Sequence, residues 1–216
     1  MPKLSEPVKP TRLDEIELWN RKVRMQREIK VNAETVLLNL VPARMWNNTI
    51  SKEELRKQSY LIGKWKRWQT ELCDRKISFN KVCFFVTGLI PQTQFQMIIL
   101  DIDVTEKVFC EHILALASWI KDVKAISMPF RINATNSGFH LFYLCDNSYE
   151  IRNIAPHELN SALKIVATWL SKIDVRGTGG FAFAPPSQFR GGHAYETLWA
   201  NSVHINRSEK FLEMLQ

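Results

Sequence analysis

The sequence predicts an α+β protein in which helices pack against a largely antiparallel sheet. From residue 81 onward, short apolar runs alternate with turns and with two stretches of helical periodicity. Glycine is absent before Gly63, and five of the eight glycines fall between Gly177 and Gly192. This distribution indicates a helical front and a back that is rich in loops.

The composition is that of a folded protein with a basic bias. Of its 216 residues, 45% are hydrophobic and 24% are charged, and 29 Lys plus Arg against 22 Asp plus Glu give a net charge of +7. This balance favours polyanionic partners. The four cysteines lack paired short spacing, so reduced thiols and no structural zinc are expected. The polar start MPKLSEPVKP and the lack of a long apolar run predict an intracellular, cytoplasmic protein without membrane association.

Residues 1–60 are expected to form a basic, helical extension, and residues 61–216 a single compact domain. From residue 11 to Leu40, apolar side chains recur at helical spacing, and SKEEL at 51–55 has the form of a capping box. The elements expected after them are a strand at 81–88, a strand at 97–104, a helix at 110–123, a turn at 136–138 followed by a strand, a helix at 157–173, a short strand at 172–175 and a strand at 180–187 that ends at two prolines. The order of the strands in the sheet stays open.

The segment IILDIDVTE places Asp101 and Asp103 at the end of an apolar strand. Side chains two residues apart in a strand project from the same face, so the two carboxylates are expected to lie close together. Like charges there require a positive partner. Hard oxygen ligands suit Mg²⁺ or Mn²⁺, although an Asp-x-Asp pattern alone is weak support for a metal site.

Two further segments carry polar groups beside glycine. In TNSGFH, Ser137 and Gly138 form a turn with exposed amide groups and His140 opens the next strand, and such donors suit a triphosphate. In IDVRGTGGFAFAPPS, Asp174 and Arg176 share one face of a strand and precede a glycine-rich turn. Taken singly, each segment is also explained as an ordinary turn or hairpin.

The order LDIDV, TNSGFHLFY, IDVRGTGGFAFAPPS resembles the bifunctional primase-polymerase (Prim-Pol) family of the archaeo-eukaryotic primase superfamily, over about residues 61–199. The resemblance implies a small αβ unit joined to a recognition-motif-like sheet, with the site between them. It also implies that Asp101, Asp103 and Asp174 hold two Mg²⁺ or Mn²⁺ ions, and that Ser137 and His140 bind the triphosphate.

The activity implied is template-dependent nucleotidyl transfer, as a DNA primase or polymerase, in the replication of a mobile element such as a plasmid or virus. Single-stranded DNA template, primer and dNTP or NTP are the expected partners, with a helicase domain or separate helicase as a further one. Charge and position add Arg176 and Lys64 as nucleotide contacts. Lys66, Arg67 and Arg190 are the candidates for holding DNA.

Three alternatives stay open at this point. One is a non-catalytic nucleic-acid-binding module for replication initiation, which would have no reason to keep all three acids. Another is a glycosyltransferase that uses Asp-x-Asp to bind a metal-bound diphosphate, which would not need Asp174. A metal-dependent nuclease ranks third, because its general base would be expected nearer the acids.

Overall fold

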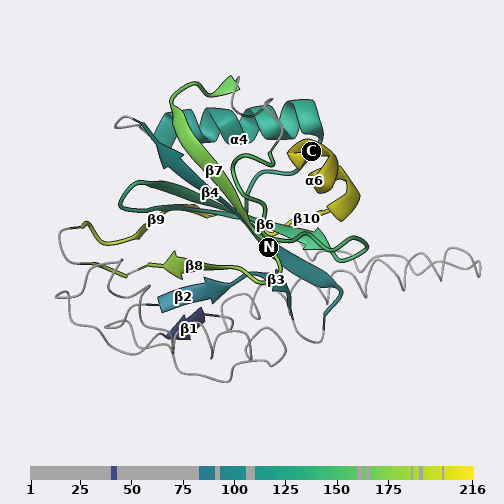
Figure 1. Cartoon of the computed structure of the whole chain (residues 1–216), viewed down its shortest axis with the longest axis horizontal. Coiled ribbons are helices and arrows are strands. Elements are labelled where there is room, and N and C mark those ends of the chain that lie inside the picture. The colour runs from purple at the N-terminus through teal and green to yellow at the C-terminus, as the bar shows by residue number, and fades with distance from the viewer. Residues whose placement is uncertain are drawn as a thin grey trace, which may run out of the picture.

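The computed structural model describes residues 40–42, 83–90, 93–105, 110–159, 163, 166–185, 187–189, 192–200 and 202–216. Their fold is α+β, as predicted. A large sheet has helices on one side and a small three-stranded sheet on the other (Figure 1). Lys64, Lys66, Arg67, Arg190 and nearly all of the expected N-terminal extension lie outside the described residues.

The large sheet is built around two long strands, β4 (Phe95–Val104) and β6 (Gly138–Asp146), which pair antiparallel along their whole length. The outer edge of β4 pairs with β3 (Gly88–Leu89) and then with β7 (Leu170–Arg176). The other edge of β6 pairs with β5 (Arg131–Ala134) and with β10 (Ile205–Asn206), and β5 also pairs with β9 (Glu196–Ala200). Only β10 runs parallel to its neighbour among the paired strands described.

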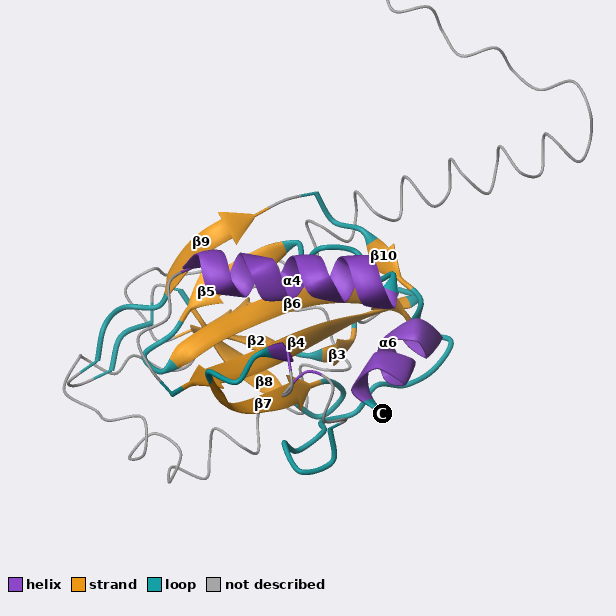
Figure 2. Ribbon diagram, turned by 90° about the horizontal axis from the view of Figure 1, so that it is seen from above, coloured by secondary structure: helices purple, strands orange, loops and turns teal. Residues whose placement is uncertain are grey.

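Helix α4 (Cys110–Lys124) lies across one face of the large sheet, and α6 (Ser208–Leu215) lies beside it (Figure 2). Residues of α4 and α6 form one core with alternate side chains of β4, β6 and β7. On β4 these are Ile98, Leu100 and Ile102. Because side chains alternate in a strand, the odd-numbered residues of β4 face away from the helices.

The small sheet consists of β1 (Leu40–Pro42), β2 (Cys83–Val86) and β8 (Phe181–Ala184), all antiparallel. A second core joins β2 and β8 to the helix-free face of the large sheet, through Phe85 and Ala182 on one side and Met97, Ile99 and Phe142 on the other. Phe85 and Phe142 meet edge to face at 5.0 Å between ring centroids. The interior of the molecule therefore has three layers: helices, large sheet and small sheet.

Two sequence predictions were wrong at their ends. The helix expected over 157–173 cannot include its last four residues, because β7 begins at Leu170. There, Ile173 and Val175 face the helices while Lys172 does not, a period of two that fits pairing with β4. The helix expected through Leu40 is wrong at that residue, which begins β1.

The strand expected over 81–88 is divided into β2 and β3. Gly88 has φ +94°, a conformation that favours glycine, at the point where the chain passes from the small sheet to the large one. The structure confirms the strand at 97–104, the helix at 110–123, the turn before β6 and the strand that stops before Pro185. No helix in the described segments is long and apolar enough to cross a membrane.

Candidate active site

Two adjacent strands, β4 and β7, bring the three predicted acids onto one face of the large sheet. Asp101 lies in β4 directly opposite Asp174 of β7, and Asp103 follows two residues later on the same face of β4. Earlier on β4, the same face is filled by Phe95, Met97 and Ile99, which pack between the sheets. The acids begin where this apolar packing ends, so the face of β4 that is directed away from the helices is apolar in its first half and acidic in its second.

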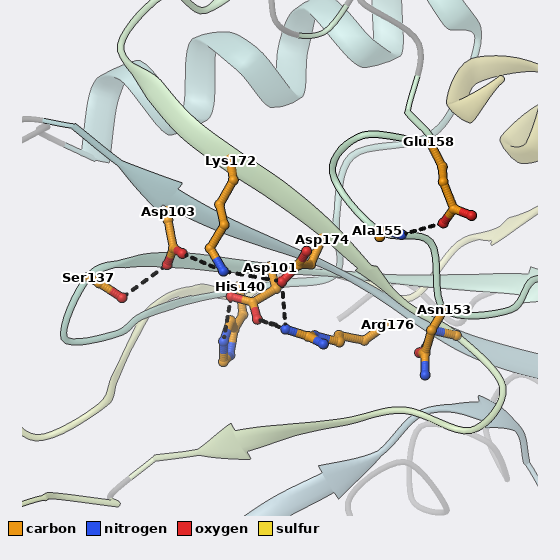
Figure 3. Close-up of polar contacts among 11 residues, drawn as sticks. Asp101, Asp103, Ser137, His140, Asn153, Ala155, Glu158, Lys172, Asp174 and Arg176 are labelled. Atoms are coloured by element: carbon orange, nitrogen blue, oxygen red, sulfur yellow. Dashed lines mark hydrogen bonds and ion pairs between the residues drawn. The ribbon is translucent and has the colours of Figure 1, made fainter. Parts of the chain in front are cut away.

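Two basic side chains from β7 hold the acids together (Figure 3). One guanidinium nitrogen of Arg176 lies 2.9 Å from Oδ2 of Asp101 and 2.8 Å from Oδ2 of Asp174. The Nζ atom of Lys172 lies 3.1 Å from Asp103 and 3.5 Å from Asp174. The positive partners that the paired aspartates require are therefore residues of the same chain.

His140 lies in β6 opposite Asp101, on the other side from Asp174. Its Nε2 is 3.3 Å from Oδ1 of Asp101, and the imidazole is almost completely buried. Its other ring nitrogen, Nδ1, is buried and has no hydrogen-bond partner among the described residues. His140 is thus oriented by Asp101, and it also lines the cavity described below.

Asp101 is the electrostatic centre of this group. Burial alone would raise the pKa of its carboxyl, but the hydrogen bond and charge of His140 and the contacts with Arg176 outweigh burial and lower it well below the usual value. Asp101 is therefore ionised throughout the physiological pH range. A permanently ionised carboxylate is available as a ligand or a charge partner without first losing a proton.

The turn between β5 and β6 contributes through Ser137, whose hydroxyl donates a hydrogen bond to Oδ1 of Asp103 at 3.0 Å. Gly138 has a structural explanation, because a Cβ atom there would overlap the carbonyl oxygen of Ile102 in β4. The next residue, Phe139, belongs to the core on the helix side of the sheet. Its bulk is therefore directed away from the acids.

A cavity of about 430 Å³ opens beside the acids, between β7, β4 and β8. Its polar lining comes from Asp101, His140, Lys172, Asp174, Arg176 and Asn153, and the segment Gly179–Phe183 supplies the opposite wall. Asn153 accepts a hydrogen bond at its side-chain oxygen from the amide of Gly177, 3.0 Å away. The hydroxyl of Thr87 donates to the carbonyl of the same glycine at 2.7 Å. These two contacts fix the start of the glycine-rich turn against the cavity.

The structure brings together every described candidate from the sequence: Asp101, Asp103, Ser137, Gly138, His140, Asp174 and Arg176. It adds Lys172 and Asn153, which were missed. The signal for Lys172 was present in KIDVR, where Lys172, Asp174 and Arg176 alternate with Ile173 and Val175. Asn153 lies in a loop, and no periodicity could have identified it.

A family model for the bifunctional DNA primase/polymerase N-terminal domain matches residues 52–208, well over half of the chain. The chain belongs to the Prim-Pol family. No curated protein matches it. The described acids and their basic partners all lie within the Prim-Pol match, and the family supports a role in nucleotidyl transfer of the primase/polymerase type.

The donor chemistry of this Prim-Pol site suits divalent ions, since three carboxylates offer hard oxygen ligands. A single cationic nitrogen of Arg176 already contacts both Asp101 and Asp174, so a cation fits the gap between them. As the side chains stand, no three acidic, histidine or cysteine groups in the described part of the chain are grouped as a metal site. The Oδ2 atom of each acid is directed to Lys172 or Arg176 instead.

Proposed function

We propose that this protein catalyses template-dependent nucleotidyl transfer, as a DNA primase or polymerase, using two divalent ions held by Asp101, Asp103 and Asp174. The observation that supports this most strongly is the convergence of the three acids on one face of the sheet, where Asp101 and Asp174 line a cavity together with Arg176 and His140. The Prim-Pol match gives the reaction class. When bound, Mg²⁺ or Mn²⁺ would supply activation of the primer 3′-hydroxyl and neutralisation of the phosphates.

The remaining residues position charge for an in-line displacement at phosphorus. Arg176 presents a planar set of N–H donors in the cavity, which suits phosphate oxygens of the incoming nucleotide. His140 orients the carboxylate of Asp101 from the opposite side. The Ser137 hydroxyl orients Asp103 in the same way, and triphosphate binding by Ser137 and His140 stays a prediction.

The partners follow from this chemistry. Single-stranded DNA template, a primer and dNTP or NTP would be the substrates, and the net charge of +7 favours such polyanions. A helicase, as a further domain or a separate protein, and replication of a mobile element would form the biological context. The glycosyltransferase alternative is disfavoured, because Asp174 shares Arg176 with Asp101 and so belongs to the same cluster as the Asp-x-Asp pair.

The test is extension of a labelled primer on a single-stranded DNA template, with Mg²⁺ or Mn²⁺ and with separate dNTP and NTP pools. We expect template-dependent products from the native protein and a loss of at least about 100-fold in Asp101→Ala/Asp103→Ala, because the metal ligands and their charge are removed. Asp122→Ala is the matched control, since Asp122 is exposed on α4, a helix that covers the opposite face of the sheet.

Two results would contradict the proposal. One is a native protein that makes no product with either pool, although it binds the DNA. The other is a double variant that extends primers as well as the Asp122→Ala control does. Omitting the primer from the native reaction then separates priming from extension.

A further inference from the structure

Lys172 is the basic residue that connects Asp103, which Arg176 does not contact, to Asp174. It lies in β7 directly opposite Asp103, two residues before Asp174, so its side chain leaves the sheet from the same face as both acids. Its Nζ atom is 3.1 Å from Oδ2 of Asp103 and 3.5 Å from Oδ2 of Asp174. Figure 3 shows the ammonium group between the two carboxylates.

The surroundings of Lys172 differ from those of Arg176. About half of the Lys172 side chain is exposed, whereas Arg176 is more enclosed and contacts Asp101 through two nitrogen atoms. A flexible, exposed ammonium group at distances of 3.1 and 3.5 Å is weakly held, since exposed ion pairs contribute little to stability. Lys172 can therefore leave the carboxylates at a small energetic cost.

Lys172 also contributes to the balance of charge at the site. Three carboxylates on one face repel one another, and Lys172 with Arg176 supplies two positive charges between them. A divalent ion bound to Asp103 and Asp174 would need the same carboxylate oxygens that Lys172 now contacts. The ammonium group and the ion cannot occupy that position together.

We infer that Lys172 is a tethered counter-ion that holds the place of a divalent ion between Asp103 and Asp174 and must leave when the ion binds. Lys172 thereby sets the metal concentration at which the site fills. Until the ion binds, the positive charge of Lys172 reduces the repulsion between the carboxylates. The inference rests on the proposed function, because it takes these acids as metal ligands. Lys172 is a positioning residue here, since it acts through the carboxylates.

The test is direct titration of the metal-free protein with Mn²⁺, in which electron paramagnetic resonance measures the concentration of unbound ion. In Lys172→Met the competing charge is lost while the length of the side chain is kept, so we expect Mn²⁺ to bind roughly three- to tenfold more tightly. Lys172→Arg keeps the charge and should bind Mn²⁺ within about twofold of the native protein. Lys210→Met is the matched control, because Lys210 is equally exposed and forms an ion pair with Glu213 in α6.

Thermal unfolding of the same proteins provides a second readout. Without metal, Lys172→Met should unfold at a lower temperature than the native protein. Saturating Mn²⁺ should raise the unfolding temperature of Lys172→Met by more than it raises that of the native protein. Unchanged or weaker Mn²⁺ binding in Lys172→Met, or no Mn²⁺ binding by any of the proteins, would overturn the inference. Primer extension is measured separately. If the native protein extends primers and Lys172→Met binds Mn²⁺ with native affinity, the proposed function stands and only the inference about Lys172 fails.

Discussion

The partly buried carboxylate of Asp101 lies between a histidine on one strand and an arginine on another, and it stays ionised because both are hydrogen-bond donors. Its pKa lies well below the usual value of 3.8. A carboxyl with a lowered pKa in the folded state stabilises the protein above the pKa of the unfolded chain, and this contribution is lost as the pH falls. The acid therefore links stability to pH at the centre of the site.

Replacement of Asp101 by Asn should remove this linkage. In metal-free buffer we expect Asp101→Asn to be less stable than the native protein by on the order of 2 kcal/mol at pH 7, with the difference narrowing as the pH falls from about 5 to 2. Urea unfolding at several pH values measures the free energy of unfolding of both proteins. Asp122→Asn, on the exposed face of α4, should follow the native curve, and a native-minus-Asp101→Asn difference that is constant with pH would refute this prediction.

Prediction of single site residues from the sequence worked where a strand imposed the geometry. The Asp-x-Asp spacing was sufficient to place Asp101 and Asp103 on one face, because side chains alternate along a regular strand and the pairing of β4 with β7 becomes irregular only after Asp103. The bridging role of Lys172 could not be predicted, since it depends on the register between β7 and β4, two strands that are distant in the chain. The position of Asn153 depends on a loop and is similarly beyond local reasoning.

Among the elements, the pairing of β4 with β6 decides how closely the turn at Ser137 approaches the acids. Asp103 pairs with Gly138, and the absence of a side chain at Gly138 allows the two backbones to meet. Any Cβ atom at this position must displace the carbonyl of Ile102, which is backbone and cannot rotate away as a side chain would. Gly138 therefore fixes the geometry of the site through packing.

We expect Gly138→Ala to destabilise the protein by at least about 2 kcal/mol, because β6 must move away from β4. Urea unfolding measures this change, and Mn²⁺ titration should show weaker binding, since Asp103 moves with its strand. The neighbouring Ser137→Ala is the control: it removes one exposed hydrogen bond and should cost only about 0.5 kcal/mol. Equal stabilities of the two variants would show that the backbones can separate freely.

The elements that were predicted correctly from the sequence have a regular spacing of apolar residues or end at a residue, such as proline, that interrupts secondary structure. The buried strand β4, the amphipathic helix α4 and the strand β8, which stops before Pro185, belong to this group. The failures lay at Leu170 and Leu40, where an apolar helical pattern continued into residues that pair with distant strands. Tertiary pairing overrides local periodicity at such boundaries.

In the whole molecule, the two sheets are held together by aromatic side chains close to the site. Phe142 of β6 contacts Phe85 of the small sheet, with ring centroids 5.0 Å apart, and also Phe130 at 6.0 Å. Its neighbour on the same face, two residues away, is His140. The layer that joins the sheets is therefore continuous with the wall of the cavity.

Phe142→Ala should lower the free energy of unfolding by about 3–5 kcal/mol, because it leaves a void between the sheets. It should also weaken nucleotide binding, since β8, which lines the cavity, is held in place by this layer. Urea unfolding and nucleotide titration measure the two effects. Leu89→Ala, an exposed apolar position in β3, is the control, and a similarly small effect in both variants would contradict this account.

The prediction of an α+β class succeeded because it needs only the kinds of elements and their alternation. The order of strands could not be predicted, since β4 pairs with β6 and β7, which are distant in the chain, as well as with its sequence neighbour β3. The small sheet illustrates the reason, as it unites residues near 40, 85 and 183. Pairings between such distant segments depend on how the apolar faces of both sheets pack in the folded protein, and not on the local sequence.

The place of β7 on the outer edge of β4 also affects the nascent chain on the ribosome. From Asp101 to Arg176 the chain grows by 75 residues, which takes roughly 4–15 s at 5–20 residues per second. During this time the second half of β4 has an unpaired edge, which is a hazard for aggregation. Charged side chains on an edge strand oppose such pairing between chains, so we expect Asp101 and Asp103 to disfavour it until β7 pairs with β4.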